Sequence, residues 1–449
     1  MKRVFSEPIE STPELFSDHL ESQVAKKFVF ISAVCPYPAD NGKKVFIEGL
    51  LRYMIEKGGA DNVSYVFIGH GSLDALDAFR KRYGLDVIHL GTIRAWEIIR
   101  NVLRSFFEKE PKSFQECVLF SKKIQSNLFT ILKQNKPDVV VMDTLRIGQY
   151  FEYEKPFPAK YIHYMEDLFS VRYERMLDPG FDQRILNAAG NFINNIPSVF
   201  RGFLNSKFIE RFLLTVELRR ISRRESSIPP KFEINLLLNE DDVGKLRKTS
   251  PQAKVTKIPP LMKISPSNKR SWNGEPTFVF VGDLKVSENS ISVETFIKDC
   301  IGPIKQKIPN FQLLIIGKGI PPSLQSLVNK FPANIKYMGF VDDIDNILSK
   351  CAAMLIPMLF GSGIRFKALD AFVRGLPVLA TPLGVEGLGL ENLGVCLISD
   401  RMEQMPDHVE LLLDKHTNQV FSENGMKFFE ERFSYDRVCR FYDSIFELR

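Results

Sequence analysis

The stretch GSGIRFKALDAFVRGLPVLATPLGVEGL, residues 361–388, is the part of the sequence that decides the fold. A Gly-Ser-Gly turn opens it and leads into a predicted helix over 363–374, whose first turns carry Arg365 and Lys367. The apolar run PVLATP follows and predicts a strand, and a second glycine-rich loop comes after it. The backbone amides of two loops, the positive end of a helix dipole and two cations together predict a site for a multiply charged anion, such as a nucleotide diphosphate.

Short apolar runs rich in valine and isoleucine alternate with helical patterns along most of the chain. Residues 26–262 contain KFVFISA, VSYVFIG, DVIHL, PDVVVMD, AKYIHYM and EINLLL, and residues 275–432 contain TFVFVG, FQLLIIG, NIKYMGF, AAMLIPM, PVLATP and VCLIS. Such runs, spaced by helices, are typical of parallel sheets that are buried on both faces. The pattern predicts an α/β protein in which two doubly wound, Rossmann-type domains face each other across a cleft.

The composition of the chain changes at the expected boundaries between its parts. Residues 1–25 are polar and acidic, and we expect a poorly ordered extension there. The stretch KISPSNKRSWNGEPT has no periodicity and predicts a linker. We therefore expect the first domain to span 26–262 and the second to span 275–432, followed by a helix at 433–449.

The charge and the cysteines limit the classes of partner and the compartment. A net charge of +6 over 449 residues suits an anionic substrate or membrane surface but is too diffuse for nucleic acid, and no nucleic-acid-binding motif occurs. The six scattered cysteines show no metal-ligand spacing and are typical of free thiols in a reducing compartment. The sequence has neither a secretory signal pattern nor an apolar window of the roughly 18 residues that a spanning helix needs. We therefore expect a cytoplasmic protein.

A basic and apolar segment at 197–225, PSVFRGFLNSKFIERFLLTVELRRISRRE, permits two interpretations. Phenylalanine and leucine among many arginines are typical of a helix that lies on an anionic membrane, here the inner face of the cell membrane. The same residues are equally typical of helices that pack on their own domain and expose a basic face to water. We favour the second interpretation slightly.

Every notable loop follows the carboxyl end of a predicted strand. These loops are Pro36–Lys44, Gly282–Lys285, Gly317–Gly319, Met358–Gly363 and Pro382–Gly389. Ligands of open parallel sheets bind beyond the carboxyl ends of the strands. Because four of the five loops belong to the second domain, we expect this domain to bind a nucleotide and the first domain to bind the acceptor.

The predicted helix at 363–374 supplies the strongest site candidates. Gly361 and Gly363 would let backbone amides approach phosphate groups, Arg365 can bind oxygens as a fork, and Lys367 acts as a point charge. Asp370 lies about 10 Å further along the axis, at ~1.5 Å rise per residue, which is roughly the distance from a diphosphate to the ribose. The alternative for Asp370 is an ordinary surface pair with Lys367.

Further donor-binding candidates come from the other loops, namely Gly42, Gly282, Lys285, Gly317, Ser362 and Glu386. Gly42 would contact the diphosphate from the first domain, or it simply forms a strand-to-helix turn. Lys285 would reach the phosphates or is solvated, and Glu386 would contact the ligand or cap a turn.

The acceptor side offers His163, Glu166, Asp167 and Arg172, in the run YIHYMEDLFSVRYERM after a predicted strand. A lone histidine in such a run is more often structural than functional, and this alternative stays open. The sequence Asp343-Ile-Asp345 mimics a pair of metal ligands, but capping of a helix explains it, so we predict no metal site.

In their order along the chain, FVGDL, IIGKG, MGFVDD and the 361–388 stretch resemble the C-terminal half of a family 4 glycosyltransferase with the GT-B fold. The runs PYPADNGKK, YMEDLFSVRYER and NEDDVGKL resemble the N-terminal half more weakly. The resemblance implies a retaining transfer of a sugar, without metal or other cofactor, from a UDP- or GDP-sugar to a saccharide or lipid-linked acceptor in cell-surface polysaccharide or glycoconjugate synthesis. It also implies that the helix at 433–449 packs back on the first domain.

Two departures from this family bear on the site. Its paired glutamates, eight positions apart, correspond here to Ser362 and Asp370, as in related members with a GSG loop. Its arginine after the FVG strand is missing, with Lys285 the nearest cation, so the diphosphate charge would rest on Arg365 and Lys367 as the catalytic residues. Two alternatives stay open: a nucleotide-sugar 2-epimerase of similar fold, and a catalytically silent partner subunit.

Overall fold

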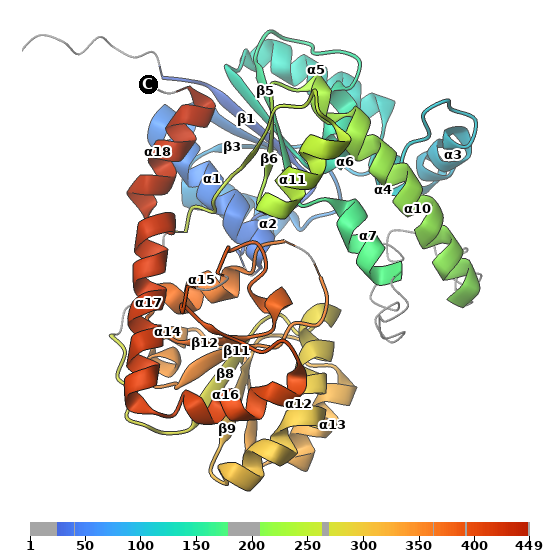
Figure 1. Cartoon of the computed structure of the whole chain (residues 1–449). Helices are drawn as coiled ribbons and strands as arrows, with labels where there is room; N and C mark the ends of the chain where they lie inside the picture. Colours follow the sequence, from blue (N-terminus) through green and yellow to red (C-terminus); the bar gives the residue numbers. More distant parts are fainter. Residues whose placement is uncertain are drawn as a thin grey trace, which may run out of the picture.

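The computed structural model of the chain describes residues 25–39, 41–177, 207–262, 269–361, 363–390 and 393–447. For residues 207–210 the description covers the backbone alone. Nearly all of the predicted extension, residues 1–24, and part of the predicted linker, residues 263–268, lie outside these ranges. The described chain forms two α/β domains, one above the other in Figure 1, and each is built on a parallel sheet with helices around it. The predicted fold class is thereby confirmed.

Among the described residues, the first domain contains a seven-stranded sheet in the order β3-β2-β1-β4-β5-β6-β7, in which all neighbours are parallel. Its strands are β1 (Phe28–Ser32), β2 (Val63–Phe67), β3 (Asp86–His89), β4 (Val139–Asp143), β5 (Lys160–Glu166), β6 (Ile234–Leu237) and β7 (Val255–Lys257). The central strands β1 and β4 are buried along their whole length, as their uninterrupted apolar runs predicted. The helices of this domain are α1 (Gly42–Gly58), α2 (Leu73–Tyr83), α3 (Ala95–Ser105), α4 (Phe114–Cys117), α5 (Lys122–Asn135), α6 (Thr144–Gly148), α7 (Phe169–Leu177), α10 (Lys207–Ser227) and α11 (Glu240–Thr249).

In the described part of the second domain, six parallel strands have the order β10-β9-β8-β11-β12-β13. They are β8 (Thr277–Val281), β9 (Gln312–Ile316), β10 (Ile335–Gly339), β11 (Ala353–Ile356), β12 (Val378–Ala380) and β13 (Leu397–Ile398). The helices are α12 (Ser287–Lys307), α13 (Pro322–Lys330), α14 (Ile344–Leu348), α15 (Phe366–Val373), α16 (Met405–Leu411), α17 (Lys415–Phe433) and α18 (Tyr435–Phe446).

In each sheet the winding of the chain reverses beside the first strand of the domain. β1 lies between β2 and β4, and β8 lies between β9 and β11. Ligands of open parallel sheets bind at such a switch point, beyond the carboxyl ends of the strands. The two switch points open onto one cleft, because Gly42, which follows β1, and Gly282, which follows β8, both line it.

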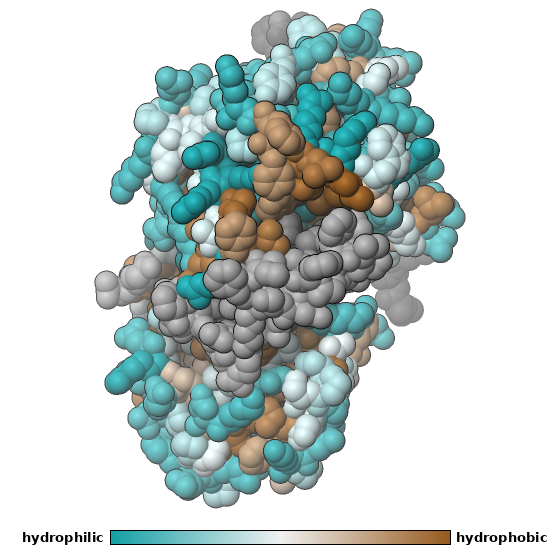
Figure 2. Space-filling view, turned by 90° about the vertical axis from the view of Figure 1, so that its right-hand side faces the viewer, coloured by the Kyte–Doolittle hydropathy of each residue, from teal (hydrophilic) through white to brown (hydrophobic). Residues whose placement is uncertain are grey.

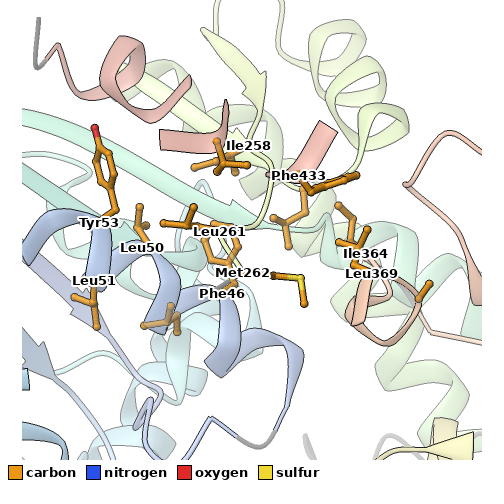
Figure 3. Close-up of a cluster of buried hydrophobic side chains, with 14 of the residues drawn as sticks. Phe46, Leu50, Leu51, Tyr53, Ile258, Leu261, Met262, Ile364, Leu369 and Phe433 are labelled. Atoms are coloured by element: carbon orange, nitrogen blue, oxygen red, sulfur yellow. The ribbon is translucent and has the colours of Figure 1, made fainter. Parts of the chain in front are cut away.

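A cluster of buried hydrophobic side chains joins the two domains beside this cleft (Figure 3). It brings together α1, the segment after β7 and the α15 region through Phe46, Leu50, Ile258, Leu261, Met262, Ile364 and Leu369. Gly49 of α1 permits the close crossing of the segment after β7, since a Cβ atom there would lie 2.1 Å from the carbonyl oxygen of Leu261. Shared apolar burial therefore fixes the position of α1 against the second domain.

The C-terminal helices run from the second domain back to the first, along the left side of Figure 1. The hydroxyl of Tyr53 in α1 donates to Asp443 of α18 at 2.8 Å, and Lys57 forms an ion pair with the same carboxylate at 2.7 Å. The rings of Phe28 and Phe446 meet edge to face, with centroids 6.1 Å apart. α18 is thus part of the packing of the first domain.

The described part of the basic segment 197–225 belongs to α10 and packs on its own domain. Arg224 is buried between Glu116 and Glu152, with charged groups 2.9 and 2.7 Å apart. Arg220 is buried as well. These two arginines stabilise the interior of the domain and do not belong to a solvated basic face. Among the described residues, no helix is both long and apolar enough to cross a membrane.

Candidate active site

The cleft between the two domains has a volume of about 620 Å³ and is lined from both sides. Of the predicted site residues, the following line it: Gly42, Glu166, Asp167, Arg172, Gly282, Gly363, Arg365, Lys367 and Asp370. Ser362 lies outside the described residues. The structure therefore gathers most of the candidates from both halves of the sequence into one place.

Arg365 precedes α15 and is half-buried in the cleft. Its guanidinium donates to the carbonyl oxygens of Leu383 at 3.1 Å and Phe360 at 3.3 Å. Within the described ranges the guanidinium of Arg365 forms no ion pair with a carboxylate. Burial lowers the pKa of this group. Gly361 adopts a φ of 111°, and a Cβ atom there would lie 2.7 Å from a guanidinium nitrogen. Gly361 is therefore required so that the arginine can fold over its own loop.

Lys367 lies two residues further on, in the first turn of α15. Its ammonium group donates to Asn289 Oδ1 at 2.8 Å and lies 4.5 Å from the centroid of the Phe280 ring. Burial is the larger cause, and the nearby charge of Arg365 the smaller one, that together lower the pKa of Lys367 to about 7. The two cations thus repel each other in a half-buried site, and a bound anion would relieve this repulsion.

Asp370 lines the same cleft but does not pair with Lys367. It forms an ion pair with Arg374, one helical turn along α15, and Arg374 also binds Asp345 at 2.9 Å. Burial raises the pKa of Asp370. The surface pair considered as an alternative is therefore absent, because Lys367 turns toward Asn289 and Asp370 toward Arg374.

Both aspartates of the sequence Asp343-Ile-Asp345 have structural partners. Asp343 caps α14 by accepting from the backbone amide of Asn346 at 3.2 Å, and Asp345 binds Arg374. In the described ranges no group of three or more histidine, cysteine or acidic side chains is placed to hold a metal ion.

The glycines predicted for donor binding permit close contacts between backbones and between domains. A Cβ atom on Gly317, which has a φ of 150°, would lie 1.8 Å from the carbonyl oxygen of Gly282, so the loops after β8 and β9 pack directly on each other. A Cβ atom on Gly42 would lie 2.6 Å from the ring of Phe366 in the second domain. Lys285 is exposed, lies along Gly319 and is not part of the cleft lining.

An ion cluster occupies the first-domain side of the cleft. Lys43 binds Asp143 at 3.0 Å and Glu166 at 2.5 Å, and Ser32 donates to Asp143 at 2.5 Å. Burial raises the pKa of Glu166, against the opposing effect of Lys43. Glu166 adopts a φ of 69°, a left-handed conformation that is costly for a residue other than glycine and is concentrated at functional sites.

The neighbouring pair of Asp167 and Arg172 also lines the cleft, with charged groups 3.0 Å apart. Arg172 belongs to α7 and lies close enough to Arg365 for its charge to lower the pKa of Arg365. The cationic site of the second domain thus continues across the cleft into the first.

His163 does not belong to the site, which corrects its prediction as an acceptor-side residue. The ring is fully buried in the first domain, with Nδ1 3.1 Å from Asn235 Oδ1 and its centroid 4.9 Å from that of Phe232. Burial lowers its pKa to about 4. The reason is that β5 is covered on both faces, so His163 points into the core while Glu166 reaches the cleft at the end of the strand.

Glu386 is engaged between the domains and is not among the residues that line the cleft, so its contact with a ligand stays a prediction. It forms a two-pronged ion pair with Arg175 of α7, which also donates to the carbonyl oxygen of Gly361 at 2.7 Å. Lys257 adds a second bridge by donating to Gly387 O at 3.0 Å. Sequence reasoning missed Arg175, although it lies in the run YMEDLFSVRYERM, because no local signal connects it to a loop 211 residues away.

The fold of the described chain is the GT-B fold of glycosyltransferases. Sucrose-phosphate synthase from Thermosynechococcus elongatus has a TM-score of 0.62 at 13% identity, over 94% of this chain and 100% of that chain. TarM of S. aureus, whose structure contains UDP and α-GlcNAc-glycerol, has a TM-score of 0.62 at 8% identity, over 94% and 99%. HepE of Anabaena, in complex with UDP and glucose, has a TM-score of 0.57 at 11% identity, over 94% and 99%.

The family is indicated by the sequence of the second domain. Residues 275–415 match the family model described as glycosyl transferases group 1. The resemblance to glycosyltransferases with the GT-B fold is thereby confirmed, with the family match confined to the second domain. No curated protein sequence matches the chain.

Proposed function

We propose that the protein transfers a sugar from a nucleotide-sugar donor to a saccharide or lipid-linked acceptor. One observation carries the proposal: Arg365 and Lys367 lie side by side in the cleft, and the described residues give neither of them a carboxylate partner. Two half-buried cations without a counterion favour a multiply charged anion as ligand. The group 1 glycosyltransferase match of the second domain supports a sugar-linked diphosphate as that anion.

In the proposed reaction, the bond between the anomeric carbon of the sugar and the diphosphate oxygen breaks. Negative charge then develops on the leaving diphosphate, where Arg365 and Lys367 would stabilise it without rearrangement. The acceptor oxygen bonds to the anomeric carbon on the same face, and its proton passes to the departing phosphate. The products are a glycoside with retained configuration and a nucleoside diphosphate, and the two cations would take the part that a metal ion plays in other transferases.

The acceptor side is proposed to be the ion cluster of Lys43 and Glu166 together with the pair of Asp167 and Arg172. Carboxylates at this position can accept hydrogen bonds from sugar hydroxyls. Asp370 is proposed for the ribose hydroxyls of the donor. UDP is the favoured nucleotide, since TarM and HepE were both solved with it, and GDP is the second candidate.

A thermal-shift screen with UDP-, GDP- and ADP-sugars tests this function, because a ligand that binds the folded state raises its melting temperature. Incubation with the stabilising donor should release its nucleoside diphosphate slowly, and rapidly once a suitable acceptor is present. Arg365→Ala should lose both effects, while Arg440→Ala, an exposed arginine on α18, should keep them.

Other outcomes of this screen would favour the alternatives. A donor whose sugar is altered but not released would indicate an epimerase. A protein that binds none of the nucleotide sugars would be a silent partner subunit, and the proposed function would be wrong. The anomeric configuration of the product, measured by NMR, tests the retention separately.

A further inference from the structure

Helix α3 carries a row of large apolar side chains that face water, whereas a helix on a globular domain normally buries such a row. Ile98 of the same helix packs on the core of the domain. Of the fourteen exposed large hydrophobic side chains in the described residues, five lie between residues 96 and 107. They are Trp96, Ile99, Leu103, Phe106 and Phe107, with exposed fractions of 53, 38, 57, 59 and 90%. The first three have the spacing of a single helix face, and Phe106 and Phe107 follow directly after the helix.

The opposite face of α3, which is largely polar, holds the helix on the domain. Glu97 accepts from Ser121 Oγ at 2.9 Å, and the amide of Asn101 donates to the carbonyl oxygen of Phe120 at 2.8 Å. Ser105 is buried and accepts from Arg220 at 2.9 Å. These contacts recur every four residues on one side of the helix, so the outward direction of the apolar side is fixed by the packing.

Basic residues surround the apolar row. A cavity of about 680 Å³ lies beside α3, and six basic side chains line it against two acidic ones. The basic residues are Arg100, Arg104, Lys109, Lys112, Lys122 and Lys231. Four of them already have contacts. Arg104 binds Glu108 at 3.1 Å and Arg100 lies 4.9 Å from the ring of Trp96. Lys231 forms an ion pair with Glu152 at 3.2 Å, and Lys112 donates to Gln149 at 3.3 Å. Figure 2, which looks onto the side of the molecule that carries α3 in Figure 1, shows hydrophobic residues gathered on its upper half with hydrophilic residues around them.

We propose that this surface, the apolar row of α3 with its basic surroundings, docks on a lipid bilayer that contains acidic phospholipids. The apolar side chains would enter the boundary between headgroups and acyl chains, and the basic cavity would hold acidic headgroups. Charge complementarity favours lipid over a second copy of the chain, because pairing two such surfaces would bring their basic residues together. The surface differs from the 197–225 segment, whose described part contributes buried arginines to the interior.

Flotation of the full-length protein with vesicles tests the proposal. The protein should float with vesicles of phosphatidylcholine and phosphatidylglycerol, and much less with phosphatidylcholine alone. Leu103→Ser with Phe107→Ser should weaken binding by roughly tenfold for each side chain lost. The matched control is Leu73→Ser with Leu411→Ser, two exposed leucines elsewhere, and it should bind like the unchanged protein.

The fluorescence of Trp96 locates the contact independently. The chain has two tryptophans, so Trp272→Phe leaves Trp96 as the only emitter. Its emission should shift to the blue with acidic vesicles and stay unchanged with neutral ones. The proposal is overturned if the protein ignores acidic vesicles, if the double serine variant binds them equally well, or if the protein is a dimer that this variant dissociates. None of these readouts depends on the proposed sugar transfer.

Discussion

The lowered pKa of Lys367 makes a quantitative prediction for nucleotide binding. In the free protein this pKa is about 7, because burial and the neighbouring Arg365 disfavour the charged form. A bound diphosphate stabilises the ammonium and raises the pKa. At pH values above 7 the free protein has lost the proton and the complex has regained it, so binding takes up a proton and weakens as the pH rises.

The magnitude follows from the size of the shift. If the pKa in the complex lies above 10, the affinity for UDP should fall about 50-fold between about pH 7 and about pH 9, with uptake of about half a proton at the lower pH and about one at the higher. Over this range the diphosphate keeps its full charge, because its last ionisation has a pKa of about 6. Isothermal titration calorimetry in buffers of different ionisation enthalpy measures both quantities.

Two variants separate Lys367 from other titrating groups. Lys367→Arg keeps its charge at all these pH values, so its affinity for UDP should not depend on pH, and at high pH it should bind more tightly than the unchanged protein. Lys367→Met should bind weakly at every pH. The reasoning is refuted if the unchanged protein binds UDP with the same affinity throughout, or if Lys367→Arg keeps the same pH slope.

Three further predictions concern other parts of the molecule. Arg365→Ala should cost ~2–4 kcal/mol of transition-state stabilisation, measured as kcat/KM, and near-normal turnover would contradict its role. Arg175→Met removes the ion pair with Glu386 and about 1–2 kcal/mol of contact between the domains, so small-angle X-ray scattering of the free protein should give a larger radius of gyration. Arg224→Met leaves buried Glu116 without a cation and Glu152 with Lys231 alone, and it should lower the free energy of unfolding by ~3–5 kcal/mol in urea titrations, whereas Arg223→Met, the exposed neighbour, should lower it little.

The second-domain side of the cleft could be predicted because its geometry is local. Gly361, Arg365, Lys367 and Asp370 lie within ten residues, and a turn followed by a helix fixes their relation whatever the rest of the chain does. The partners of these side chains could not be predicted, because they come from distant parts of the sequence. Asn289, which holds Lys367, comes from α12, and its contact depends on the packing of two elements that are far apart in the sequence.

Periodicity could not separate His163 from Glu166, because the strand that carries both is buried on its two faces and shows no alternation. Which of the two side chains lies in the cleft depends on which residue reaches the end of the sheet. α3 was missed for a different reason: a helix pattern shows which side chains share a face, but not whether that face meets the core or water. Only the contacts of Glu97 and Asn101 with the domain decide it.

The sequence by itself determined two parallel-sheet domains and, in the second, a glycine turn that leads into a helix with two cations, because strand runs and the turn depend on near neighbours along the chain. The tertiary structure alone decided that Arg175 holds Glu386 between the domains and that α3 faces outward with its apolar side. Such contacts join residues from distant elements, and their geometry exists only once both domains are packed.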